Sequence, residues 1–341
     1  MAVDRPHRVG DVANRPRPAR VAAPRRAGAI RGEPVTGQHP ATSGTTPGGR
    51  AGRELEVLRP GPLSTVQDLG RTGLAAMGVG VSGAADRRSL RLANRLVGNA
   101  EEAAAVEVTL GGLWVRARTT LVVALTGASF PVTVDGRVAA SHTVLTLGAG
   151  SELRVGQCRT GMRGYLAVRG GVEVPPVLGS RATDTLAGLG PRPLGAGSVL
   201  PVGEPHGGFP RVDAAPVATP TGGDLALAVR LGPRRDWFTP EALRRLLGEP
   251  FVVTQDSDRV GMRLSGPSLP RGETGELPSE GMVGGALQVP PDGRPTLFLA
   301  DHPVTGGYPV IAVVPSAHLP TAAQARPGQR LWFRALEEPE P

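Results

Sequence analysis

The chain has 341 residues and contains no lysine, since all 38 of its basic residues are arginine. This absence excludes a lysine Schiff base, a phosphate-binding Gly-Lys-Ser/Thr loop and a lysine that carries a cofactor covalently. Aromatic residues make up only 3% of the sequence, so the cores are predicted to be aliphatic. The single cysteine, Cys158, can form no intrachain disulfide, and no apolar run approaches the length of a membrane span. We therefore expect a cytoplasmic protein with no membrane partner.

The net charge of +8 is concentrated in residues 1–53. That segment has ten arginines against Asp4, Asp11 and Glu33, whereas the rest of the chain has 28 basic and 27 acidic residues. It is also rich in Pro, Gly, Ala and Thr and has no apolar periodicity, so it is predicted to be a disordered tail. Arg25-Arg26 is followed by no apolar run, which argues against a twin-arginine export signal. Because the remainder is nearly neutral, no nucleic-acid partner is expected.

From about Glu54 the sequence changes to short β-type runs separated by Gly, Pro and Asp turns. Asp135-Gly136, between Val132–Val134 and Arg137–Val138, predicts a hairpin with a two-residue turn. Many short strands with tight turns are typical of barrels and sandwiches. Further strands are predicted at Leu121–Leu125, Leu153–Val155, Tyr165–Arg169, Leu225–Leu231, Thr296–Ala300, Val310–Val314 and Leu331–Ala335.

Two helices are predicted, and their surroundings are similar. Asp86 can cap a helix over residues 87–97 whose apolar side chains fall on one face, and Thr239 with Pro240 can start a helix that ends near Gly248. Each helix follows a strand, a Gly-Pro turn and a carboxylate, a pattern that is also common in unrelated β proteins. We take it as weak support for two similar β-rich domains, at 54–205 and 224–338, joined by a linker at 206–223.

Neither a metal site nor a nucleophile stands out. The six histidines are dispersed, and Asp301-His302 has no second ligand at helical or hairpin spacing. Cys158 has no nearby histidine, which favours a buried thiol over a nucleophile, and no Gly-x-Ser-x-Gly elbow is present. We predict no metal site.

Polar side chains and glycines instead gather at predicted strand ends in both halves. Glycines beside amide, hydroxyl and carboxylate groups let the backbone approach a planar ligand while the ligand's amide edge is hydrogen-bonded. Any one cluster is better explained by a turn or a buried ion pair, but together they favour a small-molecule site. The clusters are Gln67-Asp68 with Arg71, Ser82-Gly83 with Asp86, Asn94, Glu107, Asp258-Arg259 with Arg263, Ser279–Gly281, Gln288, Asp301 and Thr305–Tyr308.

Two charged members of these clusters have alternative interpretations. Glu107 lies in an apolar strand, where burial would raise its pKa and an arginine partner would lower it; either suits acid–base work or structural pairing. Arg259 and Arg263, four residues apart, could hold a carboxylate or phosphate. Pairing with Asp256 and Asp258 is an equally good explanation.

These motifs resemble the biotin-dependent carboxyltransferase family. That family includes the C component of bacterial 5-oxoprolinase, also known as allophanate hydrolase subunit 2 or the KipA family. The resemblance runs in order over about residues 55–336 and leaves residues 1–53 outside it. The motifs that carry it are Thr65–Arg71, Ser82-Gly83, Asp86, Ser89–Asn99, Glu107–Gly112, Leu166–Gly171, Asp236–Phe238, Asp258–Leu264, Ser279–Gly281, Gln288–Gly293 and Thr305–Pro309.

The resemblance implies a mainly β fold with tandem cyclophilin-like β-barrel domains and a few short helices. It also implies two partners, the KipI-like B component and the A component of the enzyme. With them the protein would hydrolyse ATP to open the lactam of 5-oxo-L-proline and release L-glutamate. The location of the ATP site stays open.

Two alternatives remain. The related region of urea carboxylase transfers a carboxyl group from biotin to urea, and without lysine this chain could receive biotin only on another protein. The other alternative is a non-catalytic regulator that binds a KipI-like inhibitor of a sensor kinase.

On this resemblance we hypothesise that the lactam oxygen is activated by phosphorylation, that Asp86 or Glu280 positions or deprotonates water, and that Arg259 stabilises developing negative charge. Asp301–Val304 stands where relatives often have an Arg-Gln-like pair, so this wall of the site is expected to differ. The predicted substrate-binding residues are Gln67, Ser82, Asn94, Glu107, Gln288, Thr305, Gly307 and Tyr308.

Overall fold

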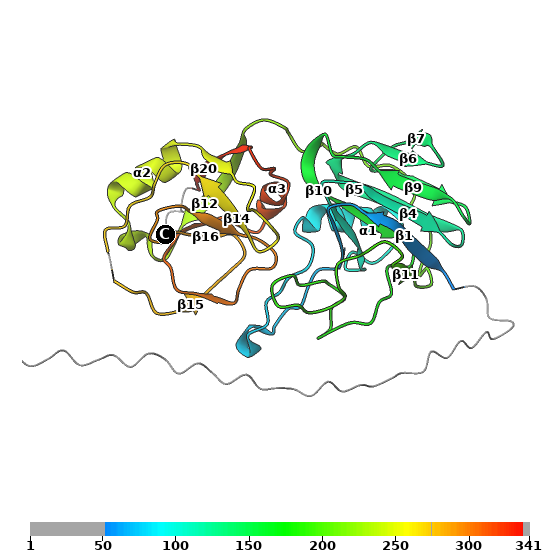
Figure 1. The fold of residues 1–341 in the computed structure, drawn as a ribbon, viewed down its shortest axis with the longest axis horizontal. Helices are drawn as coiled ribbons and strands as arrows, with labels where there is room; N and C mark the ends of the chain where they lie inside the picture. Colours follow the sequence, from blue (N-terminus) through cyan, green and yellow to red (C-terminus); the bar gives the residue numbers. More distant parts are fainter. Residues whose placement is uncertain (1–51, 274, 337–341) are drawn as a thin grey trace, which may run out of the picture. The chain divides into compact units, whose positions relative to one another are not determined.

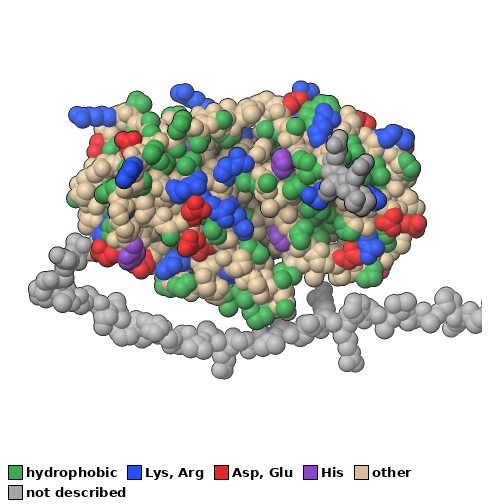
Figure 2. Space-filling view, turned by 180° about the vertical axis from the view of Figure 1, so that it is seen from behind, with side chains coloured by type: hydrophobic (Ala, Val, Ile, Leu, Met, Phe, Trp, Pro, Cys, Tyr) green, Lys and Arg blue, Asp and Glu red, His purple; other side chains and the backbone are tan. Residues whose placement is uncertain are grey.

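The computed structural model describes residues 52–273 and 275–336, so nearly all of the predicted tail lies outside the described residues. Strands dominate this part of the chain, and the prediction of a mainly β fold with a few short helices is confirmed (Figure 1). The strands fall into a first half, residues 54–201, and a second half, residues 225–335, each with its own large hydrophobic core. On the face seen in Figure 2, arginine and acidic side chains are interspersed.

The first half consists of two antiparallel sheets. The six-stranded sheet has the order β11-β1-β4-β9-β6-β7, and the five-stranded sheet has the order β2-β3-β10-β5-β8. The strands are β1 (Glu54–Pro60), β2 (Leu63–Gln67), β3 (Ala105–Thr109), β4 (Leu113–Ala117), β5 (Leu121–Ser129), β6 (Val132–Val134), β7 (Arg137–Ala139), β8 (Val144–Leu147), β9 (Glu152–Val155), β10 (Thr160–Val168) and β11 (Val199–Pro201).

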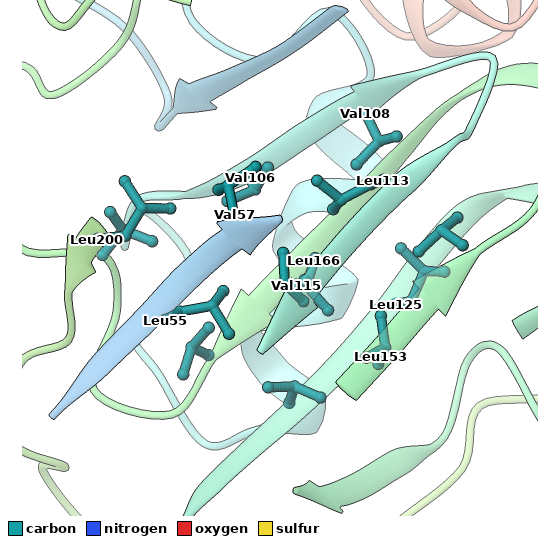
Figure 3. Close-up of a cluster of buried hydrophobic side chains, with 14 of the residues drawn as sticks. Leu55, Val57, Val106, Val108, Leu113, Val115, Leu125, Leu153, Leu166 and Leu200 are labelled. Carbon is teal, nitrogen blue, oxygen red and sulfur yellow. The ribbon is translucent and has the colours of Figure 1, made fainter. Parts of the chain in front are cut away.

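A core of aliphatic side chains fills the space between these two sheets. Leu55 and Val57 of β1 and Val115 of β4 meet Leu125 of β5 and Leu166 of β10, and all five are fully buried (Figure 3). Alternate residues of a strand point to opposite faces, so each sheet contributes one apolar face. In this half, the strands expected to form a barrel are arranged as two sheets that share one core.

Helix α1 (Arg87–Leu96) covers the outer face of the five-stranded sheet, against β5 and β10. Asp86 caps it, since its carboxylate accepts a hydrogen bond from the backbone N–H of Ser89 at 3.0 Å. Leu90 and Ala93 are buried against the sheet, as the apolar periodicity predicts. The helix starts where predicted and ends one residue earlier.

The second half contains a closed barrel with the strand order β12-β19-β16-β17-β14-β13-β20, and a two-stranded ribbon, β15-β18. Its strands are β12 (Leu225–Leu231), β13 (Phe251–Val253), β14 (Gly261–Ser265), β15 (Glu280–Gly281), β16 (Ala286–Gln288), β17 (Thr296–Phe298), β18 (Thr305–Gly306), β19 (Val310–Val313) and β20 (Arg330–Ala335). The remaining helices are α2 (Pro240–Gly248), α3 (Leu319–Ala323) and the 3-10 turns η1 (Ala75–Met77) and η2 (Arg235–Trp237).

Local sequence signals were reliable where a turn or cap specified the backbone. Asp135 and Gly136 both have positive φ, 50° and 77°, as a two-residue hairpin turn requires, and β6 pairs with β7 around them. Thr239 caps α2 and Pro240 is its first residue. Helix α3 was not predicted, because its five residues are too few to establish a periodicity.

The predicted linker, 206–223, follows the edge of the first half. The backbone N–H of Val144 donates to Asp213 O at 2.7 Å, and that of Ala215 donates to His142 O at 2.9 Å. The guanidinium carbon of Arg169 lies 4.1 Å from the ring centroid of Phe209. These contacts fix the segment on the first half, and the domain boundaries at 205 and 224 stay predictions.

Candidate functional site

Arg259 is buried between carboxylates supplied by the two halves. Its Nε and Nη2 donate to the two oxygens of Asp301, each at 2.9 Å, and Nη2 also donates to Gly83 O at 2.7 Å. Its Nη1 donates to Glu107 of β3. A buried charge is tolerated when it is paired and hydrogen-bonded. Arg259 and Asp301 therefore join the second half to Glu107 and Gly83 of the first.

Several contacts keep this ion pair charged. Burial alone would raise the pKa of Asp301, but the Arg259 guanidinium and hydrogen bonds from Thr185 outweigh it and hold the pKa below its ordinary value. Burial would lower the pKa of Arg259, and the charges of Glu107 and Asp301 raise it instead. Both groups are thus charged at neutral pH.

The partners expected for Arg259 within its own loop are wrong. The carboxylate of Asp258 accepts from the backbone N–H groups of Val260 and Gly261, and Arg259 pairs with residues 42 and 152 positions away. All three guanidinium nitrogens of Arg259 have partners and its side chain is only 2% exposed. Arg259 therefore cannot touch a substrate while this arrangement persists.

A chain of hydrogen bonds connects Glu107 to the start of α1. Glu107 Oε2 accepts from the Tyr165 hydroxyl at 2.7 Å and from the backbone N–H of Ala85 at 3.1 Å. The Tyr165 oxygen accepts from the backbone N–H of Asp86 at 2.7 Å. Burial, followed by the charges of Glu107 and Asp86, raises the pKa of Tyr165 well above its ordinary value, so the phenol keeps its proton.

The Asp86 carboxylate is held from both halves of the molecule. Oδ1 accepts from Ser89 N, and Oδ2 accepts from Ser89 Oγ at 2.7 Å and from Gln324 Nε2 at 2.8 Å. Gln324 follows α3, and its amide also pairs with the backbone of β10 at Met162 and Arg163. An ionised carboxylate can accept about four hydrogen bonds. One acceptor position of Asp86 therefore remains.

The residue Asp86 lines a cavity of about 400 Å³, which we call the Asp86 cavity. Its polar groups include Asp86, Ser89, His142, Thr321 and Gln324. His142 Nε2 lies 3.2 Å from the backbone N–H of Gly127, which can only donate, so the ring hydrogen is on Nδ1. Burial lowers the pKa of His142 and favours the neutral ring. With Arg88 and Thr221, which also line it, the cavity thus combines a fixed carboxylate, a neutral imidazole, an amide, a guanidinium and three hydroxyls.

Several predicted substrate-binding residues of the first half have internal partners. Gln67 Nε2 donates to Thr183 O at 2.9 Å, and Ser82 Oγ donates to Asp301 Oδ1 at 2.7 Å. Asn94 Nδ2 donates to Ala103 O at 2.7 Å and supports the loop after α1. With Glu107 they are all buried, and none lines the Asp86 cavity.

The predicted residues of the second half form a separate group. Glu280 pairs with Arg234, and the hydrogen bond from Arg234 lowers the pKa of Glu280. Strand β15, which contains Glu280, pairs with β18, which contains Thr305. Gln288 Nε2 donates to Tyr308 O at 3.0 Å. Gly307 and Tyr308 line another cavity, of about 670 Å³. Within the described ranges, no hydrogen bond or ion pair joins this group to Arg259, Asp86 or Glu107.

A family described as the carboxyltransferase domain, subdomain A and B, matches residues 77–335. The chain belongs to the carboxyltransferase family. The resemblance predicted from the sequence motifs is confirmed.

Two curated relatives and one solved structure illustrate the carboxyltransferase family. The chain is 38% identical to the 5-oxoprolinase C component of Escherichia coli over 282 residues, 82% of this chain and 90% of that one. It is 33% identical to the 5-oxoprolinase C component of Haemophilus influenzae over 287 residues, 83% and 91% of the two chains. The crystal structure of K. lactis urea amidolyase matches with a TM-score of 0.79 and 32% identity, over 85% of this chain. The match covers only 19% of that enzyme.

Sequence reasoning missed several residues of this carboxyltransferase-family site. Tyr165 was placed in a strand without a polar role, and His142 and Gln324 were not singled out. Gln324 carried a usable signal, since it is an amide among Ala322, Ala323 and Ala325 and so has the neighbours of a buried side chain. Its partners could not be inferred from local spacing.

In the part of the chain that the structure describes, no group of three or more His, Cys, Asp or Glu side chains is placed to hold a metal ion. Cys158 is buried, which raises the pKa of its thiol, and Sγ donates to Gly161 O. Among residues 52–273 and 275–336, none of the helices has both the length and the apolar character to cross a membrane.

Proposed function

We propose that this protein is the C component of a 5-oxoprolinase, which opens the lactam of 5-oxo-L-proline to L-glutamate together with a KipI-like B component and an A component. The observation that carries the proposal is the near-full-length similarity to the E. coli 5-oxoprolinase C component. We expect the isolated protein to have little activity, and a cytoplasmic location is part of the proposal.

The Asp86 cavity is the proposed site for the planar amide group. A lactam presents an N–H donor and a C=O acceptor along one edge. The free acceptor position of Asp86 suits the N–H, while the hydroxyl of Thr321 can donate to the carbonyl, since the Ser89 hydroxyl already donates to Asp86. The cavity volume, about 400 Å³, lies in the usual range for small-molecule sites.

Asp86 is the carboxylate that we propose to position or deprotonate water there. Ser89 and Gln324 fix its orientation, which favours catalysis because little reorganisation is needed. Glu280 is a weaker candidate, since it pairs with Arg234 and does not line the Asp86 cavity. Arg259 is proposed to act indirectly, by holding Glu107 and hence Tyr165 and the backbone of Asp86.

ATP is proposed to bind mainly to a different component of the complex. A triphosphate is bound by several cationic or N–H donors. The Asp86 cavity has Arg88 as its one arginine, and the 670 Å³ cavity that Tyr308 lines has Arg271 beside Glu273 and Glu276. These residues do not fit a triphosphate, so we assign no phosphorylation step to the described part of this chain.

The second candidate is carboxyl transfer to a urea-like amide, favoured by the similarity to K. lactis urea amidolyase. Biotin would supply the carboxyl group from another protein, because this chain has no lysine. The ureido ring of biotin has the same N–H and C=O edge as a lactam, so the polar groups of the Asp86 cavity fit it as well. Asp86 and Ser89 would then orient the ring.

The test is co-expression with the cognate A and B components and an assay of ATP-dependent glutamate release from 5-oxo-L-proline. Asp86→Asn retains an N-cap residue but removes the charge, so we expect a kcat loss on the order of 100-fold or more with an intact fold. Glu280→Gln is the matched control and is expected to stay near wild type. No release by the complete, soluble complex would reject the function, and full activity of Asp86→Asn would reject the catalytic assignment.

A further inference from the structure

A second cavity, of about 300 Å³, opens on the other side of the α1 N-terminus. We call it the Arg87 cavity, because Arg87 is its only arginine. The chain alternates between the two cavities here: Ala85 and Arg87 line this one, whereas Asp86 and Arg88 line the Asp86 cavity. The other polar residues of the Arg87 cavity are Thr72, His302 and Ser316, and its apolar residues include Val81, Ala84, Leu299 and Leu319.

Arg87 is a half-buried cation without a carboxylate partner in the described part of the chain. Its recorded side-chain hydrogen bond runs from Nη2 to Ser82 O at 3.3 Å. Arg91 and Arg95, on the same helix, both pair with Glu101. Burial, followed by the charge of Arg91, lowers the pKa of Arg87, and these effects outweigh the raising effect of the Asp68 charge, which forms no ion pair with it. An anion in the cavity would offset this cost.

His302 presents a second polar atom to the same cavity. Its Nδ1 lies 2.9 Å from Pro303 O, and a carbonyl can only accept, so Nδ1 carries the hydrogen. Nε2 is therefore an acceptor in the neutral ring and a donor in the imidazolium. A Cβ added to Gly284 would lie 3.6 Å from Nε2, so the missing side chain of Gly284 leaves space beside this nitrogen.

We propose that the Arg87 cavity binds a small carboxylate, whose anionic group meets Arg87 and whose body packs on Val81, Ala84 and Leu299. His302 and Ser316 supply the remaining polar contacts. The single arginine suits one carboxylate and not a polyphosphate. Urea has no carboxylate, so this second site separates carboxylate-bearing ligands from urea-like ones.

The carboxylate has two sources in the proposed reaction, the substrate 5-oxo-L-proline and the product L-glutamate. This choice of probes rests on the proposed function, whereas the cavity and its unpaired cation do not. Binding of the substrate alone would make the cavity a recognition site, and binding of the product would make it a site for feedback.

Calorimetric titration of the full-length protein with each of the two carboxylates tests the proposal. We expect at least one to bind, and we expect Arg87→Met to weaken that binding at least tenfold. Arg95→Met is the matched control, because it removes an exposed arginine of the same helix, and it is expected to leave Kd unchanged. Gly284→Val fills the cavity without changing charge and is expected to abolish the same binding.

The proposal is overturned if neither carboxylate binds, or if both Arg87→Met and Gly284→Val, folded by circular dichroism, bind with wild-type Kd. The titration needs neither ATP nor the other components. A complete complex that releases no glutamate would therefore reject the proposed function, while Arg87-dependent binding would still support the carboxylate site.

Discussion

Gln324 and Asp86 are 238 positions apart in the chain, and the Gln324 amide donates a 2.8 Å hydrogen bond to the Asp86 carboxylate. The same amide accepts from Met162 N and Arg163 N and donates to Arg163 O. Each polar hydrogen and lone pair of its side chain is thus used once. Through these hydrogen bonds the Gln324 side chain connects the second half to the backbone of β10 and to Asp86, the N-cap of α1.

Replacement of this amide is expected to destabilise the fold. Gln324→Leu leaves the buried N–H groups of Met162 and Arg163 without a partner, and each unsatisfied group costs about 1–3 kcal/mol. Urea denaturation of the purified protein measures the change. Gln157→Leu, at an exposed position, is the control and is expected to stay within about 0.5 kcal/mol of wild type. Equal midpoints for the two variants would contradict the role of Gln324.

Gly161→Ala is expected to displace the same amide by steric contact. A Cβ at Gly161 would lie 2.9 Å from Gln324 Oε1, Ala128 Cβ and Pro220 Cγ, and the residue has φ +75°. Gly150 has φ +84° with nothing within 4 Å of its Cβ, so Gly150→Ala reports the backbone cost alone. We expect Gly161→Ala to cost at least about 1 kcal/mol more than Gly150→Ala in thermal unfolding.

Removal of the Arg259 charge is expected to cost about 3–5 kcal/mol, because Arg259→Met leaves Asp301 buried without a cationic partner and leaves Glu107 with only Arg163, whose Nε lies 3.8 Å away. Arg330→Met breaks the exposed pair with Asp224 and is expected to cost less than about 1 kcal/mol. Guanidinium denaturation compares the two. Adding Glu107→Gln to Arg259→Met should recover part of the loss, and no recovery would argue against the buried-charge explanation.

Stability is expected to fall on mild acidification because of His142. Burial lowers the pKa of His142 in the folded protein below 6.5, so just below pH 6.5 the unfolded chain binds a proton that the folded chain does not. The unfolding free energy then decreases as pH falls through this window, by up to about 1.4 kcal/mol per pH unit. His142→Asn, which tolerates positive φ, should show a flatter dependence between about pH 7.5 and 5. Identical slopes would contradict the assignment.

The fold was predictable wherever neighbouring residues specify it. The Asp135-Gly136 turn, the Asp86 cap and the Thr239-Pro240 start each fix a backbone conformation within a few residues. Sheet order is set by pairings between distant strands, so spacing alone did not reveal that the first half forms two sheets and the second a closed barrel. Short β16 carried little periodicity of its own and was not predicted, whereas β17 lies within the predicted strand Thr296–Ala300.

The candidate site was likewise predictable only in part: the sequence indicated some of its residues but not their partners. Polar clusters and family motifs singled out Asp86, Glu107 and Arg259, and hydrogen bonds connect these three residues in the structure. The partners that determine their chemistry, Asp301 for Arg259 and Gln324 for Asp86, come from remote loops and depend on how the halves pack. Local spacing offered only Asp256, Asp258 or a bound anion as partners for Arg259.

The double attachment of Arg259, to Glu107 in one half and Asp301 in the other, has a consequence for cooperativity. If one half unfolded, Arg259 or its carboxylate partners in the other half would lose an ion pair. An intermediate with only one half folded is therefore strongly disfavoured. Residues 52–336 are expected to give one calorimetric endotherm, with equal calorimetric and van't Hoff enthalpies. Two resolved endotherms would show that the halves are energetically independent. We therefore expect Arg259 to make the two cores unfold as a single unit.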